Sequence, residues 1–279
     1  MRGITSSREW IEHYRANALD QLPIPWKEGS QLTKAQAEAI IPSLRAWQLG
    51  ETSEGKQMLA AARRYAQQAA DPEFVDVVKL FIAEEQRHGE LLGRFLDLHG
   101  APRLNRNWGD SIFRKLRHLL PNMECWTTVV IGVETLALVY YRAIMEASQS
   151  PVLRIICRQI LKDEVHHLRF QYERLALIGR RRGHFTRLFI ATLQRILFAS
   201  TTVAVWIGHH RALRAGGYSF IRFWKSAWLR MEFHWRQMRM DVCPPRLASA
   251  APGFDCRTST SERPMPRLQF ETDIRPFER

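Results

Sequence analysis

One short acidic motif occurs twice in this chain. An acidic residue followed by Glu-x-x-His stands at residues 84–88 and again at residues 163–167. Both copies lie in long stretches whose apolar residues recur every three or four positions, the period of an α-helix. Positions i and i+3 share one helix face, so each motif presents a carboxylate and an imidazole to the same point. Each copy therefore supplies half of a metal site, and two helices must meet to complete it.

The motifs fall on the apolar faces of their predicted helices. The face of the first motif also carries Phe74, Val78, Phe81, Leu92 and Phe95. The face of the second carries Leu153, Ile156, Ile160 and Gln171. Buried carboxylates and imidazoles are costly unless they pair with one another or bind a metal. We interpret the motifs as metal-ligating, and a buried polar network without metal is the alternative.

Each motif is expected to face a glutamate across a helical hairpin. Turns are predicted near residues 70–71 and 148–151, where capping residues precede a proline. In a helical hairpin, residues at equal distances before and after the turn lie opposite each other. Reflection through the turn in this sense places Glu54 opposite the first motif and Glu134 opposite the second. The two hairpins together would surround one metal centre.

The two reflected glutamates differ in how firmly the sequence selects them. Glu134 is the one acid in the apolar run 126–141. Glu54 has a rival in Glu51, which lies one turn earlier on the same face. The reflection favours Glu54, and helix boundaries predicted from sequence carry errors of a few residues.

These residues resemble the ligand set of the ferritin-like di-iron carboxylate superfamily, in which two helices each give a Glu and two others each give Glu-x-x-His. The set comprises Glu54, Glu85, His88, Glu134, Glu164 and His167. Rubrerythrin, bacterioferritin and the small subunit of class I ribonucleotide reductase are built this way. The resemblance covers residues 42–178 and implies two iron ions, bridged by Glu85 and Glu164, with Glu54 and Glu134 as terminal ligands and one histidine on each ion. Manganese, or one ion of each metal, suits the same ligands.

The acid that precedes each motif has an expected role of its own. A ligating histidine usually donates its other ring N–H to a carboxylate or carbonyl. We predict Asp163 as the partner of His88 and Glu84 as the partner of His167, with a solvated acid or an intrahelical ion pair as the alternative. Tyr141 is a candidate hydrogen-bond donor or redox-active residue near the metals, and a core tyrosine is the alternative.

The resemblance and the helical periodicity predict an all-α fold. Its centre is a ferritin-like four-helix bundle with one crossover, extended by an N-terminal helix and two C-terminal helices. The bundle helices are expected at 43–69, 72–98, 122–147 and 151–178, with a crossover helix at 111–120. The other helices are expected at 6–18, 33–42, 185–210 and 217–240. The corresponding regions are an N-terminal extension (1–41), the bundle (42–179), a basic aromatic extension (180–242) and a disordered tail (243–279).

The basic charge of the chain is concentrated in one segment. Residues 180–240 contain twelve Arg or Lys residues and one acid, whereas the whole chain has a net charge of +13. Within this segment, residues 188–207 form an apolar run of bilayer-spanning length, but Gln194 and Arg195 lie near its middle. A spanning helix is therefore not expected. The run either packs over the bundle or lies in the interface of an anionic membrane.

The function expected from the resemblance is that of an oxygen-activating di-iron oxidoreductase. Dioxygen, a small or lipophilic organic substrate and an external electron donor would be its partners. Two alternatives remain: a hydroxylase of nucleic acid such as tRNA, and a non-enzymatic iron-binding or structural protein. The N-terminus lacks a signal peptide and the four cysteines form no Cys-x-x-Cys pair, so a cytoplasmic location is expected, with peripheral membrane association as a further possibility.

Overall fold

A computed structural model of the chain describes residues 5–52, 55–105, 122–180 and 182–239. Within these ranges the chain forms eight α-helices and one 3-10 turn, with no strand, so the all-α fold class is confirmed. The chain divides into two units, residues 1–243 and 244–279. All described residues belong to the first unit. The expected crossover helix at 111–120 and the expected disordered tail lie outside the described residues.

The helices lie close to their predicted ranges, with one exception. Their bounds are α1 Ser7–Leu19, the 3-10 turn Trp26–Glu28, α2 Lys34–Glu51, α3 Lys56–Ala69, α4 Phe74–His99, α6 Met123–Ala147, α7 Pro151–Gly179, α8 His184–Ala215 and α9 Phe220–Arg239. The exception is the first bundle helix, expected as one element over 43–69. In the structure it is replaced by α2 and α3, and the short helix expected at 33–42 is the first part of α2.

Local chemistry explains this difference. Thr33 and Gln36 form a capping box that begins α2, and the helix then passes through Pro42, where the prediction ended it. Proline removes one backbone hydrogen bond, but the neighbouring Ile40 and Leu44 are fully buried and stabilise the continuous helix. α2 ends at Glu51, and Gly55, which precedes the first residue of α3, adopts the left-handed backbone region that favours glycine.

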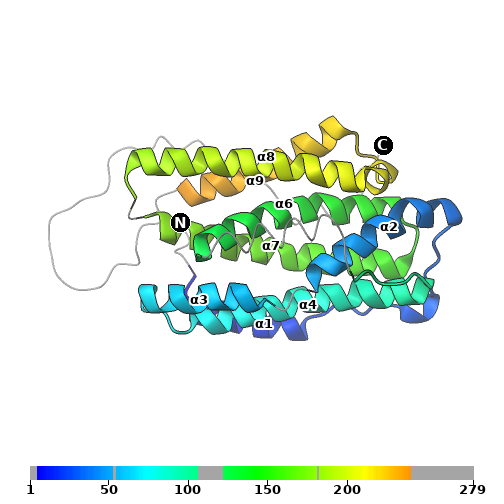
Figure 1. Cartoon of the computed structure of the whole chain (residues 1–279). Helices are drawn as coiled ribbons and strands as arrows, with labels where there is room; N and C mark the ends of the chain where they lie inside the picture. Colours follow the sequence, from blue (N-terminus) through cyan, green and yellow to red (C-terminus); the bar gives the residue numbers. More distant parts are fainter. Residues whose placement is uncertain (1–4, 53–54, 106–121, 181, 240–279) are drawn as a thin grey trace, which may run out of the picture. The chain divides into compact units, whose positions relative to one another are not determined.

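The helices pack in layers, which Figure 1 shows from the side. α6 and α7 pack against each other in the middle. On one side of this pair, α4 contacts α7 and also packs against α1, α2 and α3. On the other side, α8 and α9 cover α6 and α7. The apolar core follows the same division, because one cluster centres on α6 and α7 and a second joins α1, α3 and α4. The arrangement is that of a helical bundle with added helices.

Within the described ranges, two helices are long and apolar enough to cross a membrane by length and composition, and they differ in burial. α6 is mostly buried and forms the centre of the protein core. Little of α8 is buried, although its inner side packs on α6 through Phe198 and Leu213. The turn between α8 and α9 fits closely against α6: a Cβ at Gly216 would lie 2.2 Å from the carbonyl oxygen of Ala143. The α8–α9 hairpin is therefore docked on the bundle along one side, and its other side is exposed.

Candidate metal centre

Six acidic and histidine residues from four helices converge in the protein interior. They form two overlapping groups whose ligand atoms lie within 4.8 Å of one another. The first group is Glu85, Glu134, Glu164 and His167. The second group is Glu51, Glu85 and His88. Because Glu85 belongs to both, the residues define two adjacent positions that share a carboxylate.

The glutamates of the two motifs lie between the two imidazoles. His167 Nδ1 is 2.9 Å from Glu85 Oε1 and 3.5 Å from Glu164 Oε2. His88 Nδ1 is 3.9 Å from Glu85 Oε1 and 4.0 Å from Glu164 Oε1. Both carboxylates thus face both histidines, the arrangement that bridging ligands require.

The centre is enclosed by the apolar core. Both histidines are fully buried, and Glu51, Glu134 and Glu164 are buried as well. Glu85 is the exception, because 21% of its side chain is exposed. Both motifs continue the buried stripes of α4 and α7, as the sequence pattern predicts, so packing of these helices brings the polar groups together.

The atoms that point into the centre lack hydrogen-bond partners among the described residues. These atoms are Nδ1 of His88 and His167, Oε1 of Glu85, both side-chain oxygens of Glu134 and Oε2 of Glu164. His167 Nδ1 and Glu85 Oε1 are close, but their orientation is not that of a hydrogen bond. Leaving a buried polar atom without a partner costs about 1–3 kcal/mol. Metal ions would supply the missing partners, so the residues fit a metal centre.

Two outer carboxylates fix the orientation of the imidazoles. Nε2 of His88 lies 2.9 Å from Oδ2 of Asp163, and Nε2 of His167 lies 2.9 Å from Oε2 of Glu84. An ionised carboxylate only accepts hydrogen bonds, so Nε2 of each histidine carries the proton and donates it. In a neutral imidazole this leaves the Nδ1 lone pair directed at the centre. Each histidine therefore contacts the acid of the opposite motif, and these are the two pairs expected from the sequence.

A second layer of hydrogen bonds holds these outer acids ionised. Asn17 of α1 donates from Nδ2 to Glu84 at 2.7 Å and to Asp163 at 2.8 Å, and Gln159 donates to both oxygens of Asp163. Arg87 forms an ion pair with Glu84. Burial alone would raise the pKa of both acids, but the hydrogen bond from His88 lowers the pKa of Asp163 and that from His167 lowers the pKa of Glu84.

Asn17 and Gln159 are the functional residues that sequence reasoning missed. Asn17 follows Trp10 and Tyr14 on the buried face of α1. A polar residue on an apolar helix stripe is a signal of buried hydrogen bonding, but the sequence does not show which acids it contacts.

The carboxylates of the centre crowd one another. Burial, together with the charge of a neighbouring glutamate, raises the pKa of Glu51, Glu134 and Glu164. Burial opposes ionisation of Glu85 too, but without metal the neighbouring imidazoles of His167 and His88, in their protonated forms, lower its pKa to about 2. Like charges in a low-dielectric region repel strongly unless a cation lies between them. Two divalent cations would neutralise the four carboxylates.

On the α2 side of the centre, the described residues offer Glu51 as a ligand. Glu54, which the hairpin reflection favoured, lies outside the described residues. Glu51, its rival, is the α2 residue that joins the described cluster, and the Tyr141 hydroxyl donates a 2.7 Å hydrogen bond to its Oε1. The other five expected ligands, Glu85, His88, Glu134, Glu164 and His167, all converge.

Carboxylate and imidazole ligands around two adjacent positions suit iron, manganese or zinc, and a shared carboxylate couples the two ions. A pocket of ≈ 180 Å³ elsewhere in the molecule, between α7, α8 and α9, contains none of the cluster residues. No protein-family model, curated protein or solved structure matches this chain.

Proposed function

We propose that the protein is a ferritin-like di-iron oxidoreductase that activates dioxygen to oxidise a small or lipophilic organic substrate. The observation that carries the proposal is the convergence of two Glu-x-x-His pairs and two further glutamates around buried atoms that lack partners. A pair of ferrous ions supplies two electrons for dioxygen chemistry when it is bound in such a set. Renewed reduction requires an external electron donor, and we expect the reducing cytoplasm as the location.

In this proposal the six residues have distinct roles. Glu85 and Glu164 would help to hold both ions, because an oxygen of each carboxylate lies within 4.0 Å of Nδ1 of both imidazoles. His88 and Glu51 complete one position, and His167 and Glu134 complete the other. Glu84 and Asp163 orient the imidazoles from outside. The divided ligand set is the reason to expect two ions rather than one.

The surroundings of the centre support oxidation chemistry. The Phe81 ring packs edge-on against His167 with 4.8 Å between ring centroids, and buried apolar residues of α4, α6 and α7 exclude bulk water. Glu85 has the partly exposed side chain, so we expect small molecules to enter on its side. The Tyr141 hydroxyl, hydrogen-bonded to Glu51, holds a proton next to the position formed by Glu51 and His88. We propose that Tyr141 positions this carboxylate.

The two alternative functions differ from the proposed one in the surface or in the metal reactivity that they require. A nucleic-acid hydroxylase would use the basic segment to bind phosphates, but the exposed side of α8 is largely apolar, which disfavours RNA as its main contact. A non-enzymatic metal-binding protein would use the same ligands, but its bound metal would not react with dioxygen. Reaction with dioxygen separates that alternative from the proposed enzyme.

The test is to load metal-free protein anaerobically with two equivalents of Fe(II) and then to mix it with oxygenated buffer. We expect rapid oxidation to Fe(III), recorded as a rise in near-ultraviolet absorption, and a much smaller rise for a His88→Ala, His167→Ala double variant. Protein that holds two ferrous ions and stays ferrous in air for hours would refute the oxidase proposal. Protein that binds no iron would refute the centre itself.

A further inference from the structure

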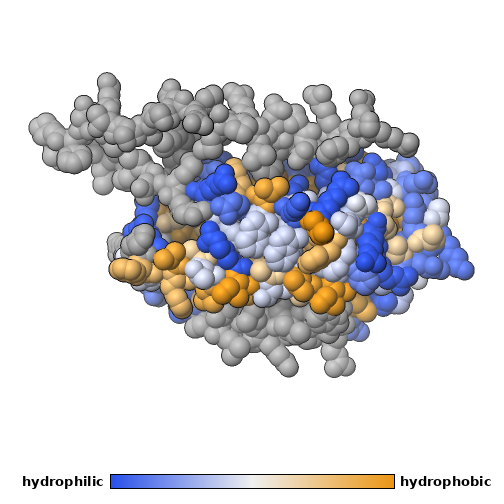
Figure 2. All heavy atoms as spheres, turned by 90° about the horizontal axis from the view of Figure 1, so that it is seen from above, coloured by the Kyte–Doolittle hydropathy of each residue, from blue (hydrophilic) through white to orange (hydrophobic). Residues whose placement is uncertain are grey.

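The outer side of α8 carries an apolar stripe along most of its length. We define this stripe as Phe189, Leu193, Ile196, Val203 and Ile207, all of them exposed. The spacing of three, four or seven residues keeps them on one helix face. Phe189 is 70% exposed and Leu193 is 55% exposed. Figure 2, which views the molecule from the side of α8 and α9, shows hydrophobic residues gathered among hydrophilic ones on this surface.

α9 extends the apolar surface and adds aromatic residues to it. Ile221 and Leu229 are strongly exposed. Trp224 and Trp228 are half-buried and stack on each other with ring centroids 5.6 Å apart. Partly exposed tryptophans present an apolar ring and a polar N–H, which suits the boundary between hydrocarbon and headgroups. A concentration of exposed apolar side chains on two neighbouring helices is typical of an interaction site.

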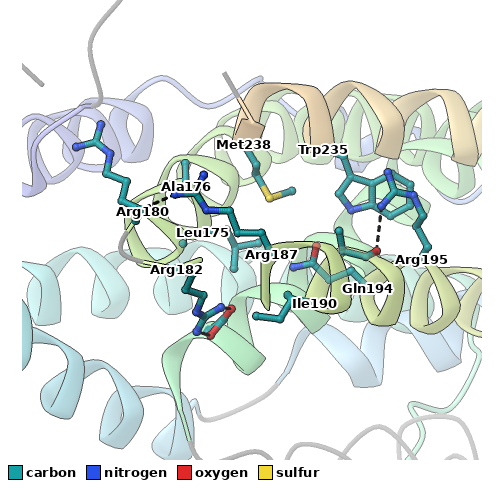
Figure 3. Close-up of a pocket in the computed structure, with 13 residues that line it drawn as sticks. Leu175, Ala176, Arg180, Arg182, Arg187, Ile190, Gln194, Arg195, Trp235 and Met238 are labelled. Atoms are coloured by element: carbon teal, nitrogen blue, oxygen red, sulfur yellow. Dashed lines mark hydrogen bonds and ion pairs between the residues drawn. The ribbon is translucent and has the colours of Figure 1, made fainter. Parts of the chain in front are cut away.

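The same two helices are strongly basic. In the part of the chain that the structure describes, Arg187, Arg195 and Arg222 donate hydrogen bonds to backbone carbonyls and not to carboxylates. Their charges are therefore available to an anionic partner. Arg187 and Arg195 also line the pocket of ≈ 180 Å³ between the end of α7, the first half of α8 and the last turns of α9, seen in Figure 3.

The pocket combines positive charge with apolar walls. Glu124 is the one acid among its lining residues, and Arg182 forms an ion pair with it. Leu175, Ile190 and Met238 form apolar walls, and the guanidinium of Arg195 stacks 4.5 Å from the Trp235 ring centroid. A recess of this kind fits an anionic headgroup whose attached chains continue over an apolar surface.

We propose that the outer face of α8 and α9 docks in the plane of an anionic lipid bilayer. The apolar stripe enters the boundary between acyl chains and headgroups, and the arginines contact lipid phosphates. The proposal rests on the pairing of exposed apolar residues with positive charge, the two properties that bind a helix to an anionic membrane surface. It does not rest on the metal centre.

The geometry favours lying on the membrane over crossing it. α8 has 32 residues, enough to cross the ~30 Å hydrocarbon core of a bilayer, so its packing and not its length decides between the two orientations. Its inner side buries Phe198, Thr202 and Leu213 in the protein. A spanning orientation would strip α8 from α6 and lose this packing.

Charge disfavours two other binding partners for the outer face of α8 and α9. A second copy of the chain would bring one basic surface against another. The segment 244–279 has six arginines and five acids, so it carries no net negative charge to complement the face. An anionic bilayer satisfies both the apolar and the cationic residues.

The test is co-sedimentation of the full-length protein with vesicles. We expect binding to vesicles of phosphatidylglycerol and phosphatidylcholine at a 3:7 ratio in 50 mM salt, with binding several-fold weaker at 500 mM salt. Pure phosphatidylcholine vesicles should bind much less. Metal-loaded and metal-free protein should bind alike, so failure here leaves the proposed function standing.

Matched variants make the test specific. A Phe189→Glu, Leu193→Glu variant should bind at least about tenfold more weakly. Leu19→Glu is the control, because Leu19 is 90% exposed but lies at the end of α1. Arg187→Gln should weaken binding to anionic vesicles, and Arg15→Gln on the exposed side of α1 should not.

Three results would overturn the proposal. The first is absence of binding to anionic vesicles at low salt. The second is equal loss of binding in the Leu19 and the Phe189–Leu193 variants. The third is a wild-type dimer in solution that Phe189→Glu converts to a monomer, with no vesicle binding by either, because the face would then be an interface between copies.

Discussion

At the scale of single residues, the centre depends on how each imidazole is held. Asp163 receives hydrogen bonds from His88, Asn17 and Gln159, so all the groups around its carboxylate are donors. This arrangement fixes the protonated nitrogen of His88 and directs the other nitrogen at the metal position. Outer partners of this kind typically change metal affinity by 10- to 100-fold when they are altered.

Asp163→Asn should therefore weaken metal binding about 10- to 100-fold while the fold is retained. The new amide N–H₂ must face at least one of three donors, and the charge that orients His88 is lost. A competition titration against a chromophoric chelator measures the effect. Asp76→Asn is the control, because Asp76 is an exposed acid on α4 that pairs with Lys79. Wild-type affinity in Asp163→Asn would contradict the role assigned to this residue.

The residues that carry a repeated pattern were predictable, and those that act through packing were not. Glu85, His88, Glu164 and His167 follow from the doubled motif, and their pairing with the opposite acids follows from helix geometry. Asn17 was not predictable, because it is 67 residues from Glu84 and 146 residues from Asp163 along the chain. The local sequence does not indicate which helices α1 packs against.

At the scale of helices, the end of α2 determines whether the second proposed metal position can form. Gly89 of α4 allows this end to approach: a Cβ there would lie 2.9 Å from Thr52 Cγ2 and 3.3 Å from the backbone carbon of Glu51. Gln48 donates to the Gly89 carbonyl across the same contact. The close approach places Glu51 beside Glu85 and His88.

Gly89→Ala should therefore displace Glu51 and release the ion bound by Glu51 and His88. We expect its metal content to fall toward one ion per chain, as in Glu51→Ala, with helical content unchanged by circular dichroism. Gly50→Ala is the control, because a Cβ at Gly50 meets no atom within 4 Å. Full metal content in Gly89→Ala, with loss in Glu51→Ala, would show that α2 tolerates the added methyl group.

Helix boundaries were the least predictable feature at this scale. Most helices lie within a few residues of their predicted ends because capping residues mark them. α2 departs from the prediction because buried neighbours outweigh the cost of Pro42, which is a tertiary effect. The same boundary bears on the choice between Glu51 and Glu54: Glu51 joins the described cluster, and Glu54 lies outside the described residues.

At the scale of the whole molecule, the metal centre and the basic face are separate. The centre lies among α2, α4, α6 and α7, whereas the apolar stripe lies on the far side of α8. The sequence predicted the fold class and the local concentration of positive charge. It left open whether the apolar run of α8 is covered, because only packing shows that one side is buried and the other exposed. A membrane-docked protein would meet lipophilic substrates, which joins the two proposals without making either depend on the other.

The most direct test of the central claim is the number of metal ions per chain. Protein reconstituted anaerobically with Fe(II) and freed of excess metal should contain two ions per chain by elemental mass spectrometry. Glu85→Ala should lose most of both ions, because Glu85 belongs to both ligand groups. Wild-type protein without bound iron, or a Glu85→Ala variant that keeps both ions, would contradict the account.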